Sequence, residues 1–349
     1  MHQPTTTTPP LAWVREGART AVRTCLNIGP ADRVFILTDD ATLTIGTLLA
    51  EEAAATGAAV VLRRLEEYGP RPLTALPPRL REDLLTFRPT ATFYAASARP
   101  GEIAFRIELL PFLTREIGAR HGHMPGITPR LMAEGLRTDY QTVARLTWRV
   151  TGIVRQARQI AVTSPAGTVL VARFSPARRW VPCPGLYHQP GQWGNLPEGE
   201  TFTAPEAVEG LVAASVLGDF FSEKYGVLPE PVLFEIVDSR LVDIQTASAT
   251  LRQELWDYLT RSENGTRVGE FAIGTNIGLR ELTGNLLQDE KLPGVHLAFG
   301  NPYPHETGAD WTARVHVDVI PTRCTVYVDG RPLLRDGQFV DLDRLLADG

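Results

Sequence analysis

Residues 13–150 alternate between two hydrophobic patterns. Amphipathic stretches with the period of a helix are followed by short, almost wholly apolar runs, which are typical of buried parallel strands. We expect helices over 13–26, 41–56 and 76–86, and strands over 33–38, 58–62 and 91–95. This alternation predicts a parallel sheet with right-handed crossovers. The turn after the first strand carries Asp39 and Asp40 and no glycine fingerprint, so we expect no nucleotide site there.

The pattern changes after a long helical stretch over 129–157. Runs over 159–163 and 168–173 flank a Ser-Pro-Ala-Gly turn and predict a β-hairpin, and a Pro- and Gly-rich loop follows over 181–199. Further strands are expected over 231–237, 240–243, 269–273, 294–299, 313–320 and 325–327, and helices over 248–260, with Ser248 as N-cap, and 276–287.

We therefore expect an α/β fold with two domains, which also suits a length of 349 residues. Residues 1–12 are expected to be a disordered tail. Residues 13–155 should form an α/β scaffold domain with a parallel sheet. Residues 156–349 should form a mixed, mostly antiparallel or barrel-like α+β domain that carries the chemistry.

Composition narrows the function classes. A hydrophobic fraction of 43% and a charged fraction of 21% are those of a globular protein. The net charge of −5, without a concentrated basic face, argues against a nucleic-acid partner. The N-terminus has no signal-peptide pattern, and no apolar run reaches the roughly 20 residues of a membrane helix. Cys25, Cys183 and Cys324 form no CxxC pair. We expect a cytoplasmic protein, outside the membrane, whose metals would have nitrogen and oxygen ligands.

Candidate chemistry begins with the run Val315–Ile320, which alternates as a strand does. Residues two apart on a strand point to the same face, so His316 and Asp318 project together, away from the neighbouring valines. An imidazole beside a carboxylate can hold a divalent metal ion. By itself the pair is more typical of a structural His–Asp contact, at the surface or buried, than of a metal site.

Three further residues strengthen the hypothesis of a metal site. Glu200 follows a Pro/Gly loop at the start of a short extended run, while Glu270 and His296 are each the single polar residue of an apolar strand. A charge in such a strand must be paired, hydrogen-bonded or metal-bound. Each residue also has an ordinary structural interpretation. Glu200 could stabilise a turn, Glu270 could face water on an edge strand, and His296 could be a hydrogen-bonded histidine of the core.

The remaining histidines are interpreted as structural or surface residues. His121-Gly122-His123 has the spacing of a metal pair, but we place it in a flexible loop of the scaffold domain. The same interpretation applies to His2, His188 and His305.

Several motifs together resemble the aminopeptidase T family of dinuclear metallopeptidases. The segments are Asn-Leu-Pro-x-Gly-Glu over 195–200, Gly-Glu-Phe-Ala-Ile-Gly-Thr-Asn over 269–276, Gly-x-His-Leu-Ala-Phe-Gly over 294–300 and His-x-Asp over 316–318. The resemblance is weaker in the first domain. It implies the metal ligands Glu200, Glu270, His296, His316 and Asp318, and a catalytic role for Tyr303.

The resemblance also implies two divalent metal ions, zinc or cobalt, a homodimer, and hydrolysis of the N-terminal peptide bond of small peptides by a metal-activated water. Tyr303 would stabilise the oxyanion, and Glu270 or Glu200 would relay a proton. The sequence does not say which glutamate bridges the ions. One alternative is a non-haem iron(II) ring-cleaving dioxygenase that uses His296, His316 and Asp318, because dihydroxypyridine dioxygenases are similar to this family in fold. Another is a non-catalytic metal-binding protein, which the lack of thiolate ligands disfavours.

Overall fold

The structure is a computed structural model that describes residues 8–218 and 220–347. It consists of two compact units: the first comprises 1–141 and 185–198, and the second comprises 142–184 and 199–349, within the described ranges. The division therefore lies before the expected boundary near residue 155. The reason is the helix α6 (Tyr140–Val154), whose Leu146, Val150 and Val154 belong to the hydrophobic core of the second unit. Most of the predicted tail lies outside the described residues.

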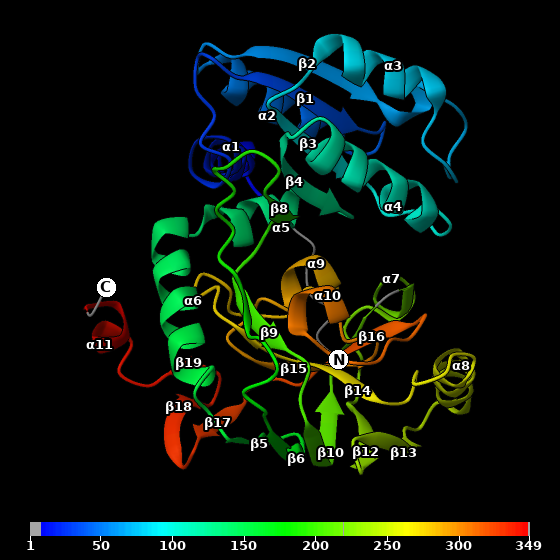
Figure 1. Cartoon of the computed structure of the whole chain (residues 1–349), viewed down its shortest axis with the longest axis vertical. Coiled ribbons are helices and arrows are strands. Elements are labelled where there is room, and N and C mark those ends of the chain that lie inside the picture. Colours follow the sequence, from blue (N-terminus) through cyan, green and yellow to red (C-terminus); the bar gives the residue numbers. More distant parts are fainter. Residues whose placement is uncertain (1–7, 219, 348–349) are drawn as a thin grey trace. The chain divides into compact units, whose positions relative to one another are not determined.

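The first unit contains the predicted parallel sheet, in the order β2-β1-β3-β4-β8. Its strands are β1 (Arg33–Thr38), β2 (Ala59–Arg64), β3 (Ala91–Ala96), β4 (Arg120–Pro125) and β8 (Trp193–Asn195). Its helices are α1 (Leu11–Thr20), α2 (Leu43–Ala54), α3 (Pro78–Phe87), α4 (Ile103–Pro111) and α5 (Pro129–Ala133), with π-helical turns at Ala21–Cys25 and Phe112–Glu116. Alternate residues of β1 and β3, such as Phe35 and Tyr94, pack against α3 and α4, which lie together on one side of this sheet in Figure 1.

One prediction for this unit is wrong. His121-Gly122-His123 is the centre of strand β4 and not a flexible loop. Both histidines are buried, and His121 Nδ1 lies 2.8 Å from the hydroxyl of Thr92 on the neighbouring strand. The polar run is compatible with a central strand because the protein itself provides its hydrogen bonds.

The second unit contains two antiparallel sheets. The eight-stranded sheet has the order β13-β12-β10-β6-β5-β17-β18-β19, and the six-stranded sheet has the order β11-β16-β15-β14-β9-β7. The first sheet comprises β5 (Gln159–Thr163), β6 (Val169–Arg173), β10 (Ala207–Ala214), β12 (Val232–Val237), β13 (Arg240–Gln245), β17 (Thr325–Val328), β18 (Arg331–Arg335) and β19 (Gln338–Phe339). The second comprises β7 (Val181–Cys183), β9 (Glu200–Thr203), β11 (Val216–Leu217), β14 (Val268–Gly274), β15 (Gly294–Gly300) and β16 (His316–Ile320).

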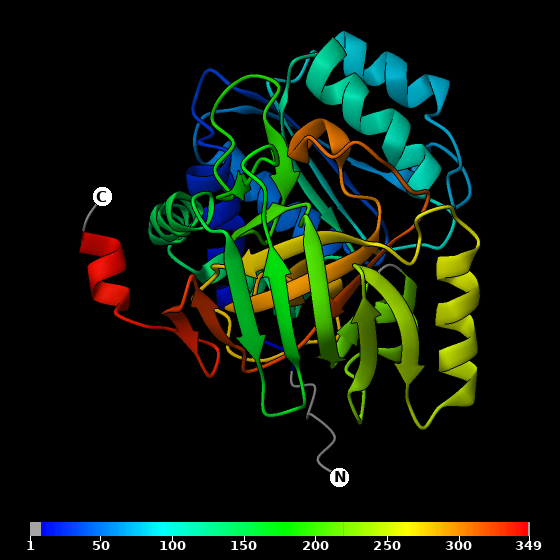
Figure 2. The same cartoon turned by 60° about the horizontal axis from the view of Figure 1, so that its bottom comes forward.

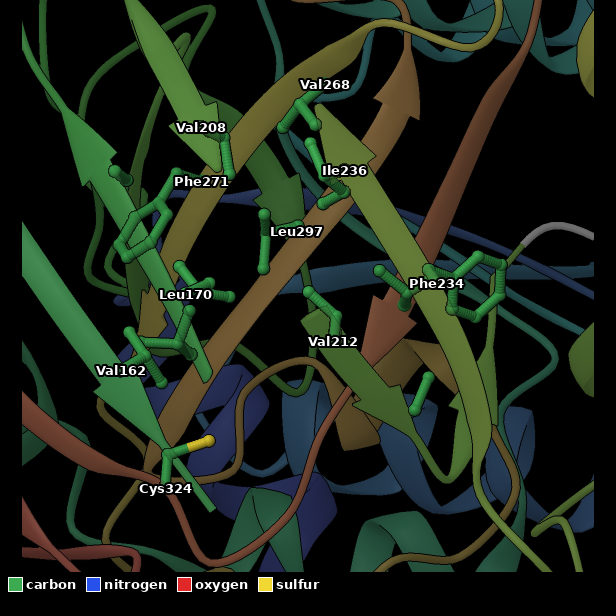
Figure 3. Close-up of a cluster of buried hydrophobic side chains, with 14 of the residues drawn as sticks. Val162, Leu170, Val208, Val212, Phe234, Ile236, Val268, Phe271, Leu297 and Cys324 are labelled. Carbon is green, nitrogen blue, oxygen red and sulfur yellow. The ribbon is translucent and has the colours of Figure 1, made fainter. Parts of the chain in front are cut away.

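A hydrophobic core fills the space between these two sheets. Figure 2 brings the eight-stranded sheet forward, with β14 and β15 crossing behind it. Figure 3 shows Val162 and Leu170 of this sheet near Phe271 and Leu297 of the other. The ring of Phe234 packs against that of Phe299, with 5.7 Å between the ring centroids. Because side chains alternate along a strand, burying this face of β14 and β15 fixes which residues occupy the opposite face.

The helices of the second unit after α6 are short: α7 (Phe220–Tyr225), α8 (Ala249–Thr260), α9 (Leu286–Asp289), α10 (Pro304–Thr307) and α11 (Leu342–Ala347). The side chain of Ser248 accepts a hydrogen bond from the Leu251 N–H and caps α8, as predicted. The predicted helix over 276–287 is wrong. Asp289 instead accepts hydrogen bonds from the N–H groups of Thr283 and Gly284 at 2.8 and 2.7 Å, which holds this segment as a loop.

Two other segments also differ from the prediction. The helical stretch 129–157 is broken between α5 and α6, where Thr138 is extended and Asp139 accepts a hydrogen bond from the Gln141 N–H at 3.0 Å. The predicted loop 181–199 contains β7 and β8, which join different sheets. Within the described ranges, no helix combines the length and the apolar composition that crossing a bilayer requires.

Candidate metal centre

The predicted ligands lie on four neighbouring strands of the six-stranded sheet. Glu200 begins β9, Glu270 lies in β14, His296 lies in β15, and His316 and Asp318 lie in β16. Their strand neighbours with opposite parity, including Phe271 and Leu297, enter the hydrophobic core. The ligands therefore share the other face, because the core residues between them determine the orientation of each strand.

Small residues occupy the positions between the ligands on this face. Ala272 pairs with His296, and Gly274 pairs with Glu200. Ala298 lies directly between Glu270 and Asp318 in the same cross-strand row. Gly300 pairs with His316. Alternation of ligands with alanine and glycine leaves room above the sheet for groups that the ligand atoms can reach.

Glu270 lies between the two imidazoles. Its Oε1 is 3.4 Å from His296 Nε2, and its Oε2 is 3.6 Å from His316 Nε2. Asp318 Oδ1 is 3.5 Å from His316 Nε2 and 4.0 Å from His296 Nε2. Glu200 Oε2 is 3.6 Å from His296 Nε2. Glu270, His296 and Asp318 each offer a ligand atom within 4.8 Å of the others. The structure thus gathers all of the predicted ligands in one place.

The backbone fixes the orientation of His316. Its Nδ1 lies 3.0 Å from the carbonyl oxygen of Asn301. A carbonyl oxygen can only accept, so Nδ1 carries a proton and Nε2 is the ring nitrogen that faces Glu270 and Asp318. A histidine ligand is commonly held in this way by a carbonyl or a carboxylate.

Sequence reasoning missed two charged residues beside the ligands. The ammonium group of Lys291 lies 2.6 Å from Glu200 Oε1 and 2.8 Å from Glu290 Oε1. Both residues follow α9 and precede the strand that carries His296. The charged run Asp289-Glu290-Lys291 next to a ligand strand was the available signal in the sequence.

The donor set fits divalent metal ions. Among the described residues, Glu200 Oε2 and His296 Nε2 are buried side-chain atoms without a hydrogen-bond partner, although each lies close to other ligands. A buried polar atom without a partner costs free energy, which coordination to a metal ion would offset. Imidazole nitrogens and carboxylate oxygens without thiolates suit zinc, cobalt, iron or manganese.

The electrostatics of the cluster favour added positive charge. Burial disfavours the charged form of His296, but the carboxylates of Glu270, Glu200 and Asp318 outweigh it and raise the pKa of His296 to about 9. The pKa of His316 is raised to about 10, against the effect of burial, chiefly by Asp318. These shifts reflect how strongly the carboxylates attract a cation, whether a proton or a metal ion.

Tyr303 lies at the edge of the cluster. Its ring is 4.8 Å from the ring of His316 and 5.9 Å from that of Phe202. The imidazole nearest to Tyr303 among these contacts is that of His316, on β16. The residue is 39% exposed. Burial around the phenol, with the nearby carboxylates of Glu270 and Asp318, raises the pKa of Tyr303 well above its ordinary value.

The other described histidines take no part in this cluster. His121 and His123 lie in the first unit, where His121 Nε2 and His123 Nδ1 are 3.2 Å apart. Burial lowers the pKa of His121 to about 3, so its imidazole is neutral. His188 Nε2 bonds to the carbonyl oxygen of Thr24. His305 is exposed on α10.

Comparison with known proteins adds two findings. Residues 144–316 match the model of a family described as thermophilic metalloprotease (M29). This segment contains Glu200, Glu270, His296 and His316, and ends two residues before Asp318. No curated protein is a significant match to the chain.

Two solved structures share the fold over nearly the whole chain. Wild-type AmpT from Thermus thermophilus has a TM-score of 0.68 at 20% identity and covers 94% of this chain and 99% of its own. The 2,5-dihydroxypyridine dioxygenase from Pseudomonas putida KT2440 has a TM-score of 0.66 at 18% identity, and the match covers 95% of this chain and 98% of that protein. The predicted fold class, a parallel-sheet α/β domain with a mostly antiparallel second domain, is confirmed. At these identities the likeness concerns the fold and not the reaction.

Proposed function

Because residues 144–316 belong to the family of thermophilic metalloproteases (M29), as the motifs predicted, we propose that this metallopeptidase is an aminopeptidase that uses two divalent metal ions. As a peptidase, the protein acts on peptides. We propose that it removes the N-terminal residue of small peptides. The observation that carries the proposal is the position of Glu270, with one carboxylate oxygen beside each imidazole.

The ligands divide into two groups around Glu270. Glu200 and His296 would hold one ion, while His316 and Asp318 would hold the other. Glu270 would bridge the ions, because its two oxygens face different histidines. The buried, unpartnered Glu200 Oε2 supports a role for this residue as a ligand, within the described part of the chain. The donor set suits zinc or cobalt.

The metal pair, when bound, would lower the pKa of a water molecule, polarise the scissile carbonyl and anchor the free amine of the substrate. The chain supplies the rest. The phenol of Tyr303 is protonated at neutral pH, so its hydroxyl can donate a hydrogen bond to the oxyanion that forms at the carbonyl. The hydrogen bond from His316 Nδ1 to Asn301 keeps Nε2 available as a ligand atom.

A second candidate is supported by the likeness to the dihydroxypyridine dioxygenase. Under this alternative, His296, His316 and Asp318 would hold one iron(II) ion and the reaction would consume oxygen. It gives no ligand role to Glu270, whose carboxylate lies between the two imidazoles, or to the buried Oε2 of Glu200, which has no hydrogen-bond partner among the described residues. For this reason we favour the hydrolase.

One experiment separates the two. The purified protein, loaded with zinc, cobalt or iron(II) in turn, is incubated in air and anaerobically with tripeptides that have free or acetylated amino ends, and with a dihydroxypyridine. We expect hydrolysis of the free peptides only, with zinc or cobalt, at the same rate with and without oxygen. Oxygen-dependent loss of the pyridine without peptide hydrolysis would establish the dioxygenase instead.

We also propose that the protein is a homodimer. The outer face of the eight-stranded sheet carries exposed apolar side chains, among them Val169 and Tyr327, which are 61% and 38% exposed. Exposed apolar groups on a sheet face favour burial against a second copy. Light scattering of the wild type and of Val169→Glu tests this, because the charge should favour monomers. The cytoplasmic location stays a prediction; Cys25 and Cys324 are buried and not joined by a disulfide, as is usual in a reducing compartment.

A further inference from the structure

Lysine is rare in this chain, and one lysine lies beside the metal centre. Of the 35 basic residues, only Lys224 and Lys291 are lysines. Lys224 lies on the surface, where its side chain is 48% exposed and pairs with Glu254. The Lys291 side chain is 1% exposed. A buried lysine in a chain that otherwise uses arginine indicates a position that requires a compact ammonium group and not a planar guanidinium.

The ammonium group of Lys291 lies between two carboxylates. Glu200 Oε1 is 2.6 Å away, and Glu290 Oε1 is 2.8 Å away. The backbone of Lys291 is also held, because its N–H donates to the carbonyl of Gln288 at 2.9 Å and its carbonyl accepts from the Asn276 N–H at 3.0 Å. Burial raises the pKa of the Glu290 carboxyl to about 8, against the opposing effect of Lys291.

This contact makes the two oxygens of Glu200 unequal. Oε1 accepts a charge-assisted hydrogen bond from Lys291. Oε2 is buried, has no hydrogen-bond partner among the described residues, and faces His296 Nε2 at 3.6 Å. Without Lys291, either oxygen could turn toward the ion or away from it.

We propose that Lys291 is a positioning residue for the metal centre: it holds Oε1 of Glu200 so that Oε2 alone is presented to the metal ion beside His296. Lys291 does not act on the substrate, since its ammonium group is buried between two anions. The inference rests on the proposed metal centre and extends it to a residue that is not a ligand. Groups that orient a ligand in this way typically contribute 10- to 100-fold to metal affinity.

The first test uses the wild-type protein and exploits the scarcity of lysine. Full-length protein labelled with ¹³C-lysine gives side-chain signals from Lys224 and Lys291 only. The metal-stripped protein is titrated with zinc chloride and followed by NMR. We expect the Cε signals of Lys291 to move in step with zinc binding and those of Lys224 to stay in place. Zinc binding without a response from Lys291 would overturn the proposal.

The second test uses variants. Lys291→Met alone leaves two buried carboxylates facing each other and is liable to misfold. The double variant Glu290→Gln/Lys291→Met also replaces the ionisable carboxyl of Glu290 by a neutral amide and avoids this. Calorimetric titration with zinc should show one equivalent weakened 10- to 100-fold, the same one that Glu200→Gln weakens, while the other is unchanged. Lys224→Met is the matched control and should bind zinc as the wild type does.

The outcomes distinguish an error about the role of Lys291 from an error about the metal centre itself. If the wild type binds zinc and the double variant binds both equivalents equally well, or loses both equally, Lys291 has no positioning role. If the wild type binds no zinc in this site, the metal centre itself is wrong, and the role of Lys291 is wrong with it.

Discussion

Gly218 is the position where a single methyl group should damage the metal centre. It follows β11, and its N–H donates to the carbonyl of Asp318 at 2.8 Å. A Cβ added to Gly218 would lie 2.5 Å from the backbone nitrogen of Asp318, 2.8 Å from its Cβ, and closer still to its carboxylate. Ordinary contact begins at 3.4 Å. Gly218→Ala therefore requires the new methyl group and the Asp318 nitrogen to move apart by about 0.9 Å, from 2.5 Å to the 3.4 Å of an ordinary contact.

That displacement must fall on Asp318 or on the backbone of β11, because the nearest atoms belong to the Asp318 backbone and its short side chain. Metal ligands need to be placed within about 0.5 Å of their productive positions, and a 1 Å error can cost about 100-fold in rate. We expect Gly218→Ala to lower peptidase activity about 100-fold and to weaken zinc binding. Overpacking should also cost roughly 1–3 kcal/mol of stability.

Gly152→Ala is the matched control. Gly152 lies in α6 of the same unit, and a Cβ there would meet no atom of the described residues within 4 Å apart from the adjacent backbone of the helix itself. Alanine should be tolerated and should add up to about 1 kcal/mol of helix stability. Both variants are measured by zinc calorimetry, urea unfolding and peptide hydrolysis. Wild-type zinc affinity and activity in Gly218→Ala would refute the argument, because Asp318 would then be misplaced without consequence or not be a ligand.

Three further predictions concern the histidines and Tyr303. His316→Ala should lose metal and activity together, and full metal content in this variant would exclude His316 as a ligand. His121→Ala should lower the melting temperature but keep its metal. Tyr303→Phe should keep its metals and its KM but lose about 100-fold in kcat, and near-normal turnover would assign Tyr303 to packing alone. Because burial lowers the pKa of His121 to about 3, below about 6.5 in the unfolded chain, the unfolded state binds the extra proton as the pH falls from 6.5 toward 3. His121 should therefore cost about 2 kcal/mol of stability between pH 7 and pH 5. The difference in urea unfolding between the wild type and His121→Gln measures this, and identical pH profiles would contradict it.

Much of the framework follows from local patterns in the sequence. Strand β1 occupies the predicted residues, and β14 and β15 extend the predicted strands by one or two residues. A short apolar run with one polar residue fits a strand, because its apolar side chains can enter the core while the polar one faces the site. The spacing of His316 and Asp318 places them on one face whatever surrounds them. The N-cap at Ser248 is equally local.

What the sequence did not determine depends on contacts between distant residues. The segment 276–287 has a helical pattern, yet Asp289 holds it as a loop, and the buried strand at His121 is stabilised by a hydroxyl on the next strand. The neighbours of each ligand depend on the order and register of β9, β14, β15 and β16, which no local pattern encodes. For the same reason, only the tertiary structure placed Glu270 between the two imidazoles and buried Lys291 against Glu200. Electrostatic interactions act between side chains that the fold brings together, and chain spacing alone does not reveal which those are.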